Sequence, residues 1–225
     1  MMGNQSSDDG DVGNLIHVSV DSTTVEGNLS VPEGAEGIVL FAHGTGSSRH
    51  SPRNNFVAEK LRDGGLATLL IDLLTSEEKE IDRRTRRIRF DIDRLAERVV
   101  GAMEWLAGQS ETEDLGIGLF GSSTGAAAAL IAATKRPSLA SAVVSRGGRV
   151  DMAEPILDEV TAPTLFIVGG KDRQVLDLNR QALAKLETEK QLEVIPGAGH
   201  LFEEPGALDA VARLAREWFQ RHLRS

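Results

Sequence analysis

The chain has 225 residues, of which 40% are hydrophobic and 26% charged, and its formal net charge is −9 at pH 7. Such a composition is typical of a globular protein with one domain and is unlike that of a disordered or fibrous chain. The excess of acidic residues argues against a nucleic-acid partner, because affinity for a phosphate backbone comes from concentrated Lys and Arg. The absence of cysteine excludes disulfides, thiolate nucleophiles and cysteine-based zinc sites.

The sequence shows neither a membrane segment nor a secretory signal. No apolar run approaches the length that a bilayer requires. Residues 1–13 are polar and acidic, so they lack the basic and then apolar layout of a signal peptide. We expect a disordered tail at residues 1–13, a single domain at residues 14–225, no membrane partner and a cytoplasmic location.

The first part of the chain predicts a hairpin followed by strands and a helix. Residues 15–20 and 23–31 alternate apolar and polar side chains around a turn, which is typical of an antiparallel hairpin at a sheet edge. Buried strands are predicted at residues 37–42 and 66–73, with a helix between them.

The stretch of residues 76–89 is dense in charge, with acids before a run of arginines. We interpret it as a solvated connection and helix start with ion pairs between residues i and i+4, and a docking surface is the alternative. The helix after it, at residues 90–106, carries apolar residues on one stripe and therefore faces the core.

The second half of the chain continues the alternation of strands and helices. Strands are predicted at residues 115–120, 141–144, 164–168 and 191–195, and helices at residues 126–133, 174–186 and 205–223. Continuous apolar strands between helices are typical of parallel strands that are covered on both faces. The sequence therefore predicts an α/β fold with a mostly parallel, doubly wound sheet of eight strands.

The segment Gly121-Ser122-Ser123-Thr124-Gly125 lies between a predicted strand and a predicted helix. In the nucleophile-elbow motif Gly-x-Ser-x-Gly, glycines flank the serine because a strand that reverses sharply into a helix crowds its neighbours and strains the central residue. Ser123 is therefore the candidate nucleophile, with Ser122 as the nearest substitute. The motif alone also occurs in ordinary glycine-containing turns, so its value depends on the rest of the chain.

Two further residues complete a candidate catalytic triad. Asp172 follows the predicted strand at residues 164–168, and His200 follows the strand at residues 191–195. The chain order serine, acid, histidine is that of α/β-hydrolase triads, and open α/β sheets assemble their sites at the carboxyl ends of strands. We predict Asp172 as the acid and His200 as the base. The alternatives are Glu203, Glu204, Asp151 or Asp177 as the acid and His43 as the base.

The loop at residues 43–48 follows a buried strand and is the candidate source of an oxyanion donor. In this architecture, the backbone N–H of the residue after the nucleophile acts together with an N–H from the loop after the third strand. The first donor is then Thr124. The second is predicted to be Thr45, with Gly46 as the alternative. We interpret His43 as a structural residue that bonds the loop backbone, because the base is already supplied.

Cationic residues follow two of the predicted strands. Arg49 comes after the oxyanion loop and Arg146 after the sixth strand, each with further cations close by: His50, Arg53 and Arg149. Arg146 and Arg49 are candidates for binding an anionic group of the substrate, and pairing with nearby acids is the alternative for each. Phe202 is interpreted as a packing residue that is close enough to the catalytic histidine to line the pocket.

With these residues in place, the chain resembles the α/β-hydrolase superfamily over nearly its whole length, and within it the dienelactone hydrolase-like group of small proteins without a large cap domain. The short connection at residues 145–161 fits that group. Dienelactone hydrolases use a cysteine nucleophile, whereas position 123 is serine. The resemblance implies hydrolysis of a small-molecule ester or lactone, with no metal and no organic cofactor.

We therefore expect a serine esterase that works through Ser123, His200 and Asp172 and an acyl-enzyme. Two alternatives remain open. An acyltransferase uses the same triad but resolves the acyl-enzyme with an alcohol. A non-catalytic binding module keeps the shape of a hydrolase without its chemistry.

Overall fold

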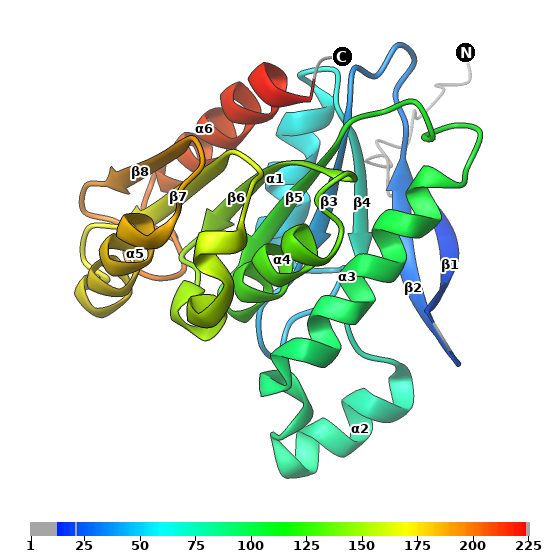
Figure 1. Ribbon diagram of the computed structural model, residues 1–225, viewed down its shortest axis with the longest axis horizontal. Helices are drawn as coiled ribbons and strands as arrows, with labels where there is room; N and C mark the ends of the chain where they lie inside the picture. Colours follow the sequence, from blue (N-terminus) through cyan, green and yellow to red (C-terminus); the bar gives the residue numbers. More distant parts are fainter. Residues whose placement is uncertain (1–12, 21, 224–225) are drawn as a thin grey trace, which may run out of the picture.

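The computed structural model describes residues 13–20 and 22–223. Apart from Gly13, the tail predicted at residues 1–13 lies outside the described residues. The described chain forms one sheet of eight strands in the order β1-β2-β4-β3-β5-β6-β7-β8 (Figure 1). The strands are β1 Asn14–Val20, β2 Thr23–Ser30, β3 Ile38–Ala42, β4 Ala67–Ile71, β5 Ile117–Ser122, β6 Ala140–Arg146, β7 Thr164–Gly169 and β8 Lys190–Ile195.

The sheet is antiparallel at one edge and parallel through the rest. β1 pairs with β2, and β2 with β4, in antiparallel register, whereas every pair from β4 and β3 to β7 and β8 is parallel. β3, β4, β5 and β7 are buried at every position, which explains why their sequences are continuous apolar runs. The predicted edge hairpin and the mostly parallel sheet of eight strands are confirmed.

Helices cover both faces of the sheet (Figure 1). α1 and α6 pack on one face, in a core cluster that includes Phe41, Phe120 and Phe219. α3, α4, α5 and the 3-10 helix η2 cover the other face, where the small side chains of α4 allow a close approach to the strands. The helices are α1 Pro52–Arg62, α2 Ser76–Thr85, η1 Ile88–Phe90, α3 Ile92–Ala107, α4 Thr124–Lys135, η2 Val150–Glu159, α5 Arg173–Lys185 and α6 Ala207–His222.

Residues 76–89, predicted as a solvated connection and helix start, contain a separate helix, α2. Thr75 begins α2 through a capping box: its hydroxyl accepts the N–H of Glu78 at 3.1 Å, and the Glu78 carboxylate accepts the N–H of Thr75 at 2.9 Å. The expected i,i+4 ion pair is present between Glu80 and Arg84 at 3.2 Å. In Figure 1, α2 lies at the bottom of the view, on the side where the parallel strands end.

The connection between β6 and β7 holds η2, which its sequence did not predict. Pro155 lies inside this helix, and its missing N–H together with the absence of a clear apolar period explains why no element was expected there. The described residues contain no cap domain over the sheet, in agreement with the expected fold. None of the helices within residues 13–20 and 22–223 combines the length and the apolar character that a membrane span requires.

Candidate active site

Ser123 occupies a sharp turn between the last residue of β5 and the first residue of α4. Its φ is 51° and its ψ is −122°, a backbone conformation that residues other than glycine rarely adopt. The glycines on either side are required by close contacts. A Cβ on Gly121 would lie 2.4 Å from the backbone of Ala126, and one on Gly125 would lie 2.2 Å from the carbonyl oxygen of Ala42. The local structure is that of the predicted nucleophile elbow.

Backbone hydrogen bonds hold the elbow against the end of β6. The N–H of Ser123 donates to the carbonyl of Arg146 at 3.3 Å, and the N–H of Arg149 donates to the carbonyl of Ser123 at 3.0 Å. The serine side chain is half-buried. Because both of its neighbouring peptide groups are anchored, the strained conformation is fixed rather than one of several that the turn samples.

The structure brings His200 and Asp172 into direct contact. Nδ1 of His200 lies 2.6 Å from Oδ2 of Asp172. Two backbone bonds join the loops that carry them, since the N–H of Lys171 donates to Ala198 and the N–H of Gly170 donates to Ile195, both at 2.9 Å. With the proton on Nδ1 donated to the carboxylate, Nε2 is left as the acceptor that a general base needs.

The other acids considered as triad members have partners of their own. Asp151 bonds Arg149 at 2.8 and 2.9 Å, Asp177 bonds Arg180 at 3.2 Å, Glu203 bonds Arg53 at 3.1 Å, and Glu204 accepts the N–H of Gly199 at 3.0 Å. Among the acids named from the sequence, Asp172 is therefore the one whose carboxylate contacts the histidine.

Ser123 and His200 open onto the same small space, which we call the catalytic hollow. Its volume is about 200 Å³. The residues that line it are Ser123, Arg149, Gln174, Val175, Leu178 and His200. Ser123 and His200, the nucleophile and base predicted from the sequence, are 77 positions apart. Both line one space at the carboxyl edge of the sheet.

The two predicted oxyanion residues also meet. The hydroxyl oxygens of Thr45 and Thr124 share a hydrogen bond at 2.9 Å. Thr124 is the first residue of α4, where backbone N–H groups have no partner within the helix and the helix dipole favours negative charge. The loop of Thr45 lies against the nucleophile, because a Cβ on Gly44 would be 2.9 Å from Cβ of Ser123. No pattern in the sequence predicted the bond between the two hydroxyls.

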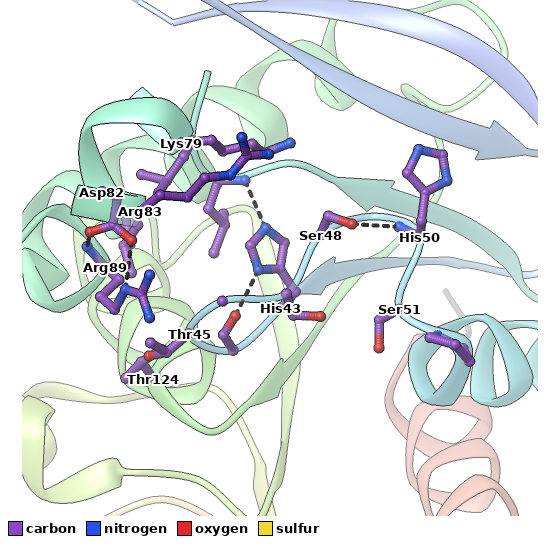
Figure 2. A pocket seen from close by; sticks show the side chains of 17 residues that line it. His43, Thr45, Ser48, His50, Ser51, Lys79, Asp82, Arg83, Arg89 and Thr124 are labelled. Atoms are coloured by element: carbon purple, nitrogen blue, oxygen red, sulfur yellow. Dashed lines mark hydrogen bonds and ion pairs between the residues drawn. The ribbon is translucent and has the colours of Figure 1, made fainter. Parts of the chain in front are cut away.

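His43 is a structural residue, as its sequence context predicted. Its Nε2 accepts the N–H of Leu73 at 3.1 Å and its Nδ1 donates to the carbonyl of Gly44 at 2.9 Å (Figure 2). Burial lowers the pKa of His43 below its ordinary value. The ring is therefore neutral and ties the oxyanion loop to the end of β4, and it has no free nitrogen with which to act as a base.

Comparison with known proteins assigns the chain to a family. The model of the dienelactone hydrolase family matches residues 25–224. The chain belongs to this family. A crystal structure of dienelactone hydrolase from Anabaena variabilis ATCC 29413 is 60% identical, with a TM-score of 0.92 over 94% of this chain and 98% of that one. Est1E from Butyrivibrio proteoclasticus shares the fold at 15% identity, with a TM-score of 0.77 over 92% of this chain and 98% of its own.

A Mycobacterium tuberculosis protein with the name "Putative phosphoribosyl transferase" is 54% identical over 208 residues, which are 92% of this chain and 46% of that protein. The chain therefore spans about half the length of this curated relative. The predicted resemblance to the α/β-hydrolase superfamily and, within it, to the dienelactone hydrolase group is confirmed.

In this member of the dienelactone hydrolase family, a buried carboxylate supports the loop after β3, the candidate oxyanion loop. Asp72, just after β4, accepts the backbone N–H of Arg49 at 3.1 Å, bonds its guanidinium, and pairs with Lys79 at 2.8 Å. Burial raises the pKa of Asp72, but the bonds from Lys79 and Arg49 outweigh it and leave the pKa below its ordinary value. The sequence signal available for this role was an acid inside a predicted apolar strand.

Arg49 does not take the predicted role in substrate binding. Its guanidinium is held by Asp72 and, at 2.7 Å, by Glu26, and the residue does not line the catalytic hollow. The pairing with nearby acids, which was the alternative for Arg49, is present in the structure. Phe202 is 2% exposed and belongs to the core cluster under α1 and α6, so it packs rather than lining the hollow.

Arg146 ends β6 and is 9% exposed. Its Nη1 is buried and has no hydrogen-bond partner among the described residues, and its guanidinium lies 6.0 Å from the centre of the Phe120 ring. Burial, followed by the nearby charge of Arg53, lowers the pKa of Arg146 to about 10. Like Arg49, Arg146 does not line the catalytic hollow. It differs from Arg49 because it is buried without an acid partner among the described residues, which is costly.

A second space, which we call the large chamber, begins at the Thr45 and Thr124 pair and has a volume of about 510 Å³. It is lined by most of the loop at residues 43–52, by Lys79, Asp82, Arg83 and Arg89, by Leu73, Leu74 and Leu95, and by Thr124. Figure 2 shows Thr45, Thr124 and Arg89 together at one end and His50 and Ser51 at the other. Neither Ser123 nor His200 lines it.

The described residues contain no group of three or more His, Cys, Asp or Glu side chains arranged to hold a metal ion. The groups that the site offers are a serine hydroxyl, an imidazole held by a carboxylate, and the backbone N–H groups at the start of α4 and in the loop at residues 43–48.

Proposed function

We propose that the chain is a serine hydrolase that cleaves small carboxylic esters or lactones through Ser123, His200 and Asp172. The observation that carries the proposal is the catalytic hollow shared by the strained serine and by a histidine whose Nδ1 is 2.6 Å from a carboxylate. A nucleophile, a base and a group that orients the base are the three parts that acyl transfer to a serine requires.

The mechanism has two halves. The Ser123 hydroxyl attacks the ester carbonyl while Nε2 of His200 takes its proton, and the imidazolium formed is stabilised by Asp172. His200 then returns the proton to the leaving alkoxide, which leaves an acyl group on Ser123. Water, activated by the same histidine, attacks the acyl-enzyme and releases the acid.

The oxyanion of each tetrahedral intermediate would be stabilised by the backbone N–H groups of Thr124 and Thr45. The position of Thr124 at the start of α4 supports this role. Removing one such donor costs on the order of 3 kcal/mol of transition-state stabilisation in enzymes of this type. The hydroxyl bond between the two threonines, at 2.9 Å, supports their assignment as a pair.

The first test is hydrolysis of p-nitrophenyl acetate by the wild type, Ser123→Ala and Asp172→Asn. We expect Ser123→Ala to abolish turnover and Asp172→Asn to lower kcat by roughly 10⁴-fold, because the histidine then takes the wrong tautomer. Asp177→Asn, which removes a carboxylate from an exposed pair with Arg180, is the matched control and should keep full activity. Wild-type turnover by Ser123→Ala would overturn the assignment.

A fluorophosphonate probe separates the hydrolase from a non-catalytic binding module, because only an activated serine is phosphonylated. Mass spectrometry should find the adduct on the peptide that contains Ser123. An unmodified Ser123 after long exposure favours the binding module. Acyl transfer uses the same site, so product analysis with added alcohol distinguishes it: esters of the added alcohol in excess of free acid would favour the transferase.

We further propose that Arg146 attracts an anionic group of the substrate, since its buried guanidinium has no acid partner among the described residues. Turnover of a neutral ester and of a carboxylate-bearing ester is compared in the wild type, Arg146→Ala and the exposed control Arg180→Ala. A selective loss on the carboxylate-bearing ester in Arg146→Ala is expected, and equal losses on both esters reject the role.

A further inference from the structure

We propose that the acyl group of the substrate occupies the large chamber under α2 while the alcohol departs through the catalytic hollow, so that the preferred substrates join a large, mainly apolar acyl group to a small alcohol. This inference rests on the proposed esterase function and deepens it. The two spaces differ in volume by more than a factor of two, at about 510 and 200 Å³, so the assignment of each space decides the substrate class.

The catalytic hollow is the leaving-group side because it contains the proton donor. His200 must return its proton to the leaving alkoxide, so the alcohol oxygen lies beside the imidazole when the bond breaks. His200 and Ser123 both line the hollow. At about 30 Å³ for each water-sized group, a volume of this size holds roughly six or seven non-hydrogen atoms, which is the size of a small alcohol.

The large chamber is the acyl side because it begins at the predicted oxyanion donors. Thr45 and Thr124 line it, whereas Ser123 and His200 do not. The chamber reaches the serine through Gly44, which also lines it and on which a Cβ would lie 2.9 Å from Cβ of Ser123. The carbonyl oxygen points at these donors in the tetrahedral intermediate, and the substituent that stays on Ser123 extends away from the histidine. By the same measure of volume, the chamber holds on the order of 17 non-hydrogen atoms.

The lining of the large chamber favours an apolar acyl chain. Leu73, Leu74 and Leu95 supply apolar surface. The charged groups of the wall are already paired: Lys79 with Asp72 at 2.8 Å, Arg89 with Asp82 at 2.6 Å and Arg83 with Glu80 at 3.0 Å. An acid beside each cation offsets its positive charge, so this wall attracts an anionic ligand less strongly than unpaired cations would.

α2 and η1 form a fixed wall of the chamber. Asp82 is buried, and it accepts both the backbone N–H of Arg89 at 3.0 Å and its Nε at 2.6 Å. The guanidinium of Arg89 lies over the oxyanion loop, 3.7 Å from where a Cβ on Gly46 would stand. The segment that carries the pair is therefore held against the loop, and it bounds the length of the acyl chain that fits.

The test uses two ester series with the purified protein: ethyl esters of acetic, hexanoic and decanoic acid, and acetate esters of ethanol, hexanol and decanol. We expect kcat/KM to rise by about tenfold or more from ethyl acetate to ethyl hexanoate, since each methylene that enters an apolar pocket adds to transition-state binding. We expect it to fall by a similar factor from ethyl acetate to decyl acetate, because decanol exceeds the roughly six or seven non-hydrogen atoms that the hollow holds. The opposite ranking overturns the proposal.

Two variants assign the spaces separately. Ser47→Trp narrows the large chamber, which Ser47 lines, and Leu178→Trp narrows the catalytic hollow. The readout is the ratio of kcat/KM for ethyl hexanoate to that for ethyl acetate, which cancels any general loss of activity. Ser47→Trp should lower this ratio about tenfold or more, and Leu178→Trp should leave it within about twofold, because the alcohol is the same in both esters.

A ratio that responds to Leu178→Trp and not to Ser47→Trp would exchange the two spaces and overturn the proposal, and so would a ratio that responds to neither. These outcomes leave the esterase function standing, because the esters are still hydrolysed and Ser123→Ala still abolishes turnover. If the wild type hydrolyses no ester of either series, the proposed function itself fails and this inference fails with it.

Discussion

Replacing Asp72 by Asn tests whether the buried carboxylate holds the oxyanion loop. The substitution keeps the size of the side chain but removes its charge. Asp72 is 2% exposed, and it bonds the backbone N–H and the guanidinium of Arg49 as well as the ammonium of Lys79. The amide leaves two cations at a buried position without their shared counter-charge.

The loss in the free energy of unfolding depends on how much ion pairing each of the two cations loses. Breaking a buried ion pair by removing one partner costs about 3–5 kcal/mol. The Lys79 side chain is 30% exposed, so water replaces part of its lost partner, and Arg49 keeps Glu26 at 2.7 Å. We therefore expect the lower end, about 3 kcal/mol off the free energy of unfolding. For a chain of this length, such a loss lowers Tm by roughly 6–12 °C.

The same substitution should reduce catalysis. The N–H of Arg49 that Asp72 accepts lies four residues after Thr45, so releasing it loosens the loop that carries the proposed donor. A misplacement of about 1 Å at such a donor costs up to about a hundredfold in rate. We expect kcat to fall by tenfold to a hundredfold, as an order of magnitude, with KM little changed, because the donors act on the transition state.

Urea unfolding followed by circular dichroism measures the stability, and p-nitrophenyl acetate kinetics well below both Tm values measure the rate. Asp177→Asn is the control, because its pair with Arg180 is 66% exposed on the acid side and such pairs contribute less than about 1 kcal/mol. Equal stability losses in Asp72→Asn and Asp177→Asn, or an unchanged kcat in Asp72→Asn, would refute the reasoning.

Three further predictions follow from His43, Gly125 and Ser123. Because burial lowers the pKa of His43 below 6.5, the stability that its neutral ring confers is complete above the unfolded pKa and is lost as the pH falls through 6.5 towards the folded pKa. His43→Gln should therefore flatten the decline of Tm between pH 7 and 5, and an unchanged slope contradicts this. Gly125→Ala places a Cβ 2.2 Å from a backbone oxygen and should yield little folded protein, whereas Gly108→Ala, with contacts of 3.6 Å, should fold normally; soluble yield and circular dichroism compare them. At position 123, glycine relieves a backbone strain of about 1–3 kcal/mol, which exceeds the roughly 0.5–1 kcal/mol of chain entropy that glycine costs. Ser123→Gly should therefore be more stable in urea than Ser123→Ala. At Ser141, which lacks a positive φ, the glycine variant should instead be less stable than the alanine variant.

Most of the fold was predictable because its signals are local. A strand buried on both faces is a continuous apolar run, and the two strands of the edge hairpin alternate apolar and polar residues. All eight strands begin and end within a few residues of their predicted positions. α2 was not predicted as a separate helix because it is nearly all polar, although Thr75 and Glu78 have the capping-box spacing of a helix start. η2 was not predicted because a 3-10 helix that contains proline has no regular apolar period.

The candidate triad was predictable for a related reason. Each member directly follows a parallel strand, and parallel strands end at one edge of the sheet, so the sequence alone places the three side chains near one another. The strand order supports this, since β5, β6, β7 and β8 are neighbours. The hydroxyl bond between Thr45 and Thr124 was not predictable, because 79 residues separate them and no local pattern links a loop to the first turn of a distant helix.

The ion pairs that support the oxyanion loop were beyond prediction because proximity along the chain does not choose between partners. In the stretch at residues 76–89, Glu80 has both Arg83 and Arg84 within helical reach, and Asp82 has both Lys79 and Arg86. Exposed pairs differ by less than about 1 kcal/mol. In the structure, both partners lie outside α2: the Lys79 side chain pairs with Asp72 after β4, and Asp82 pairs with Arg89 beyond the end of α2. Asp72 and Asp82 are the two acids of this region that are buried. A buried carboxylate needs its partner far more than an exposed one does, so burial, which depends on the packing of β4, α2 and the oxyanion loop together, decides which pairs shape the site.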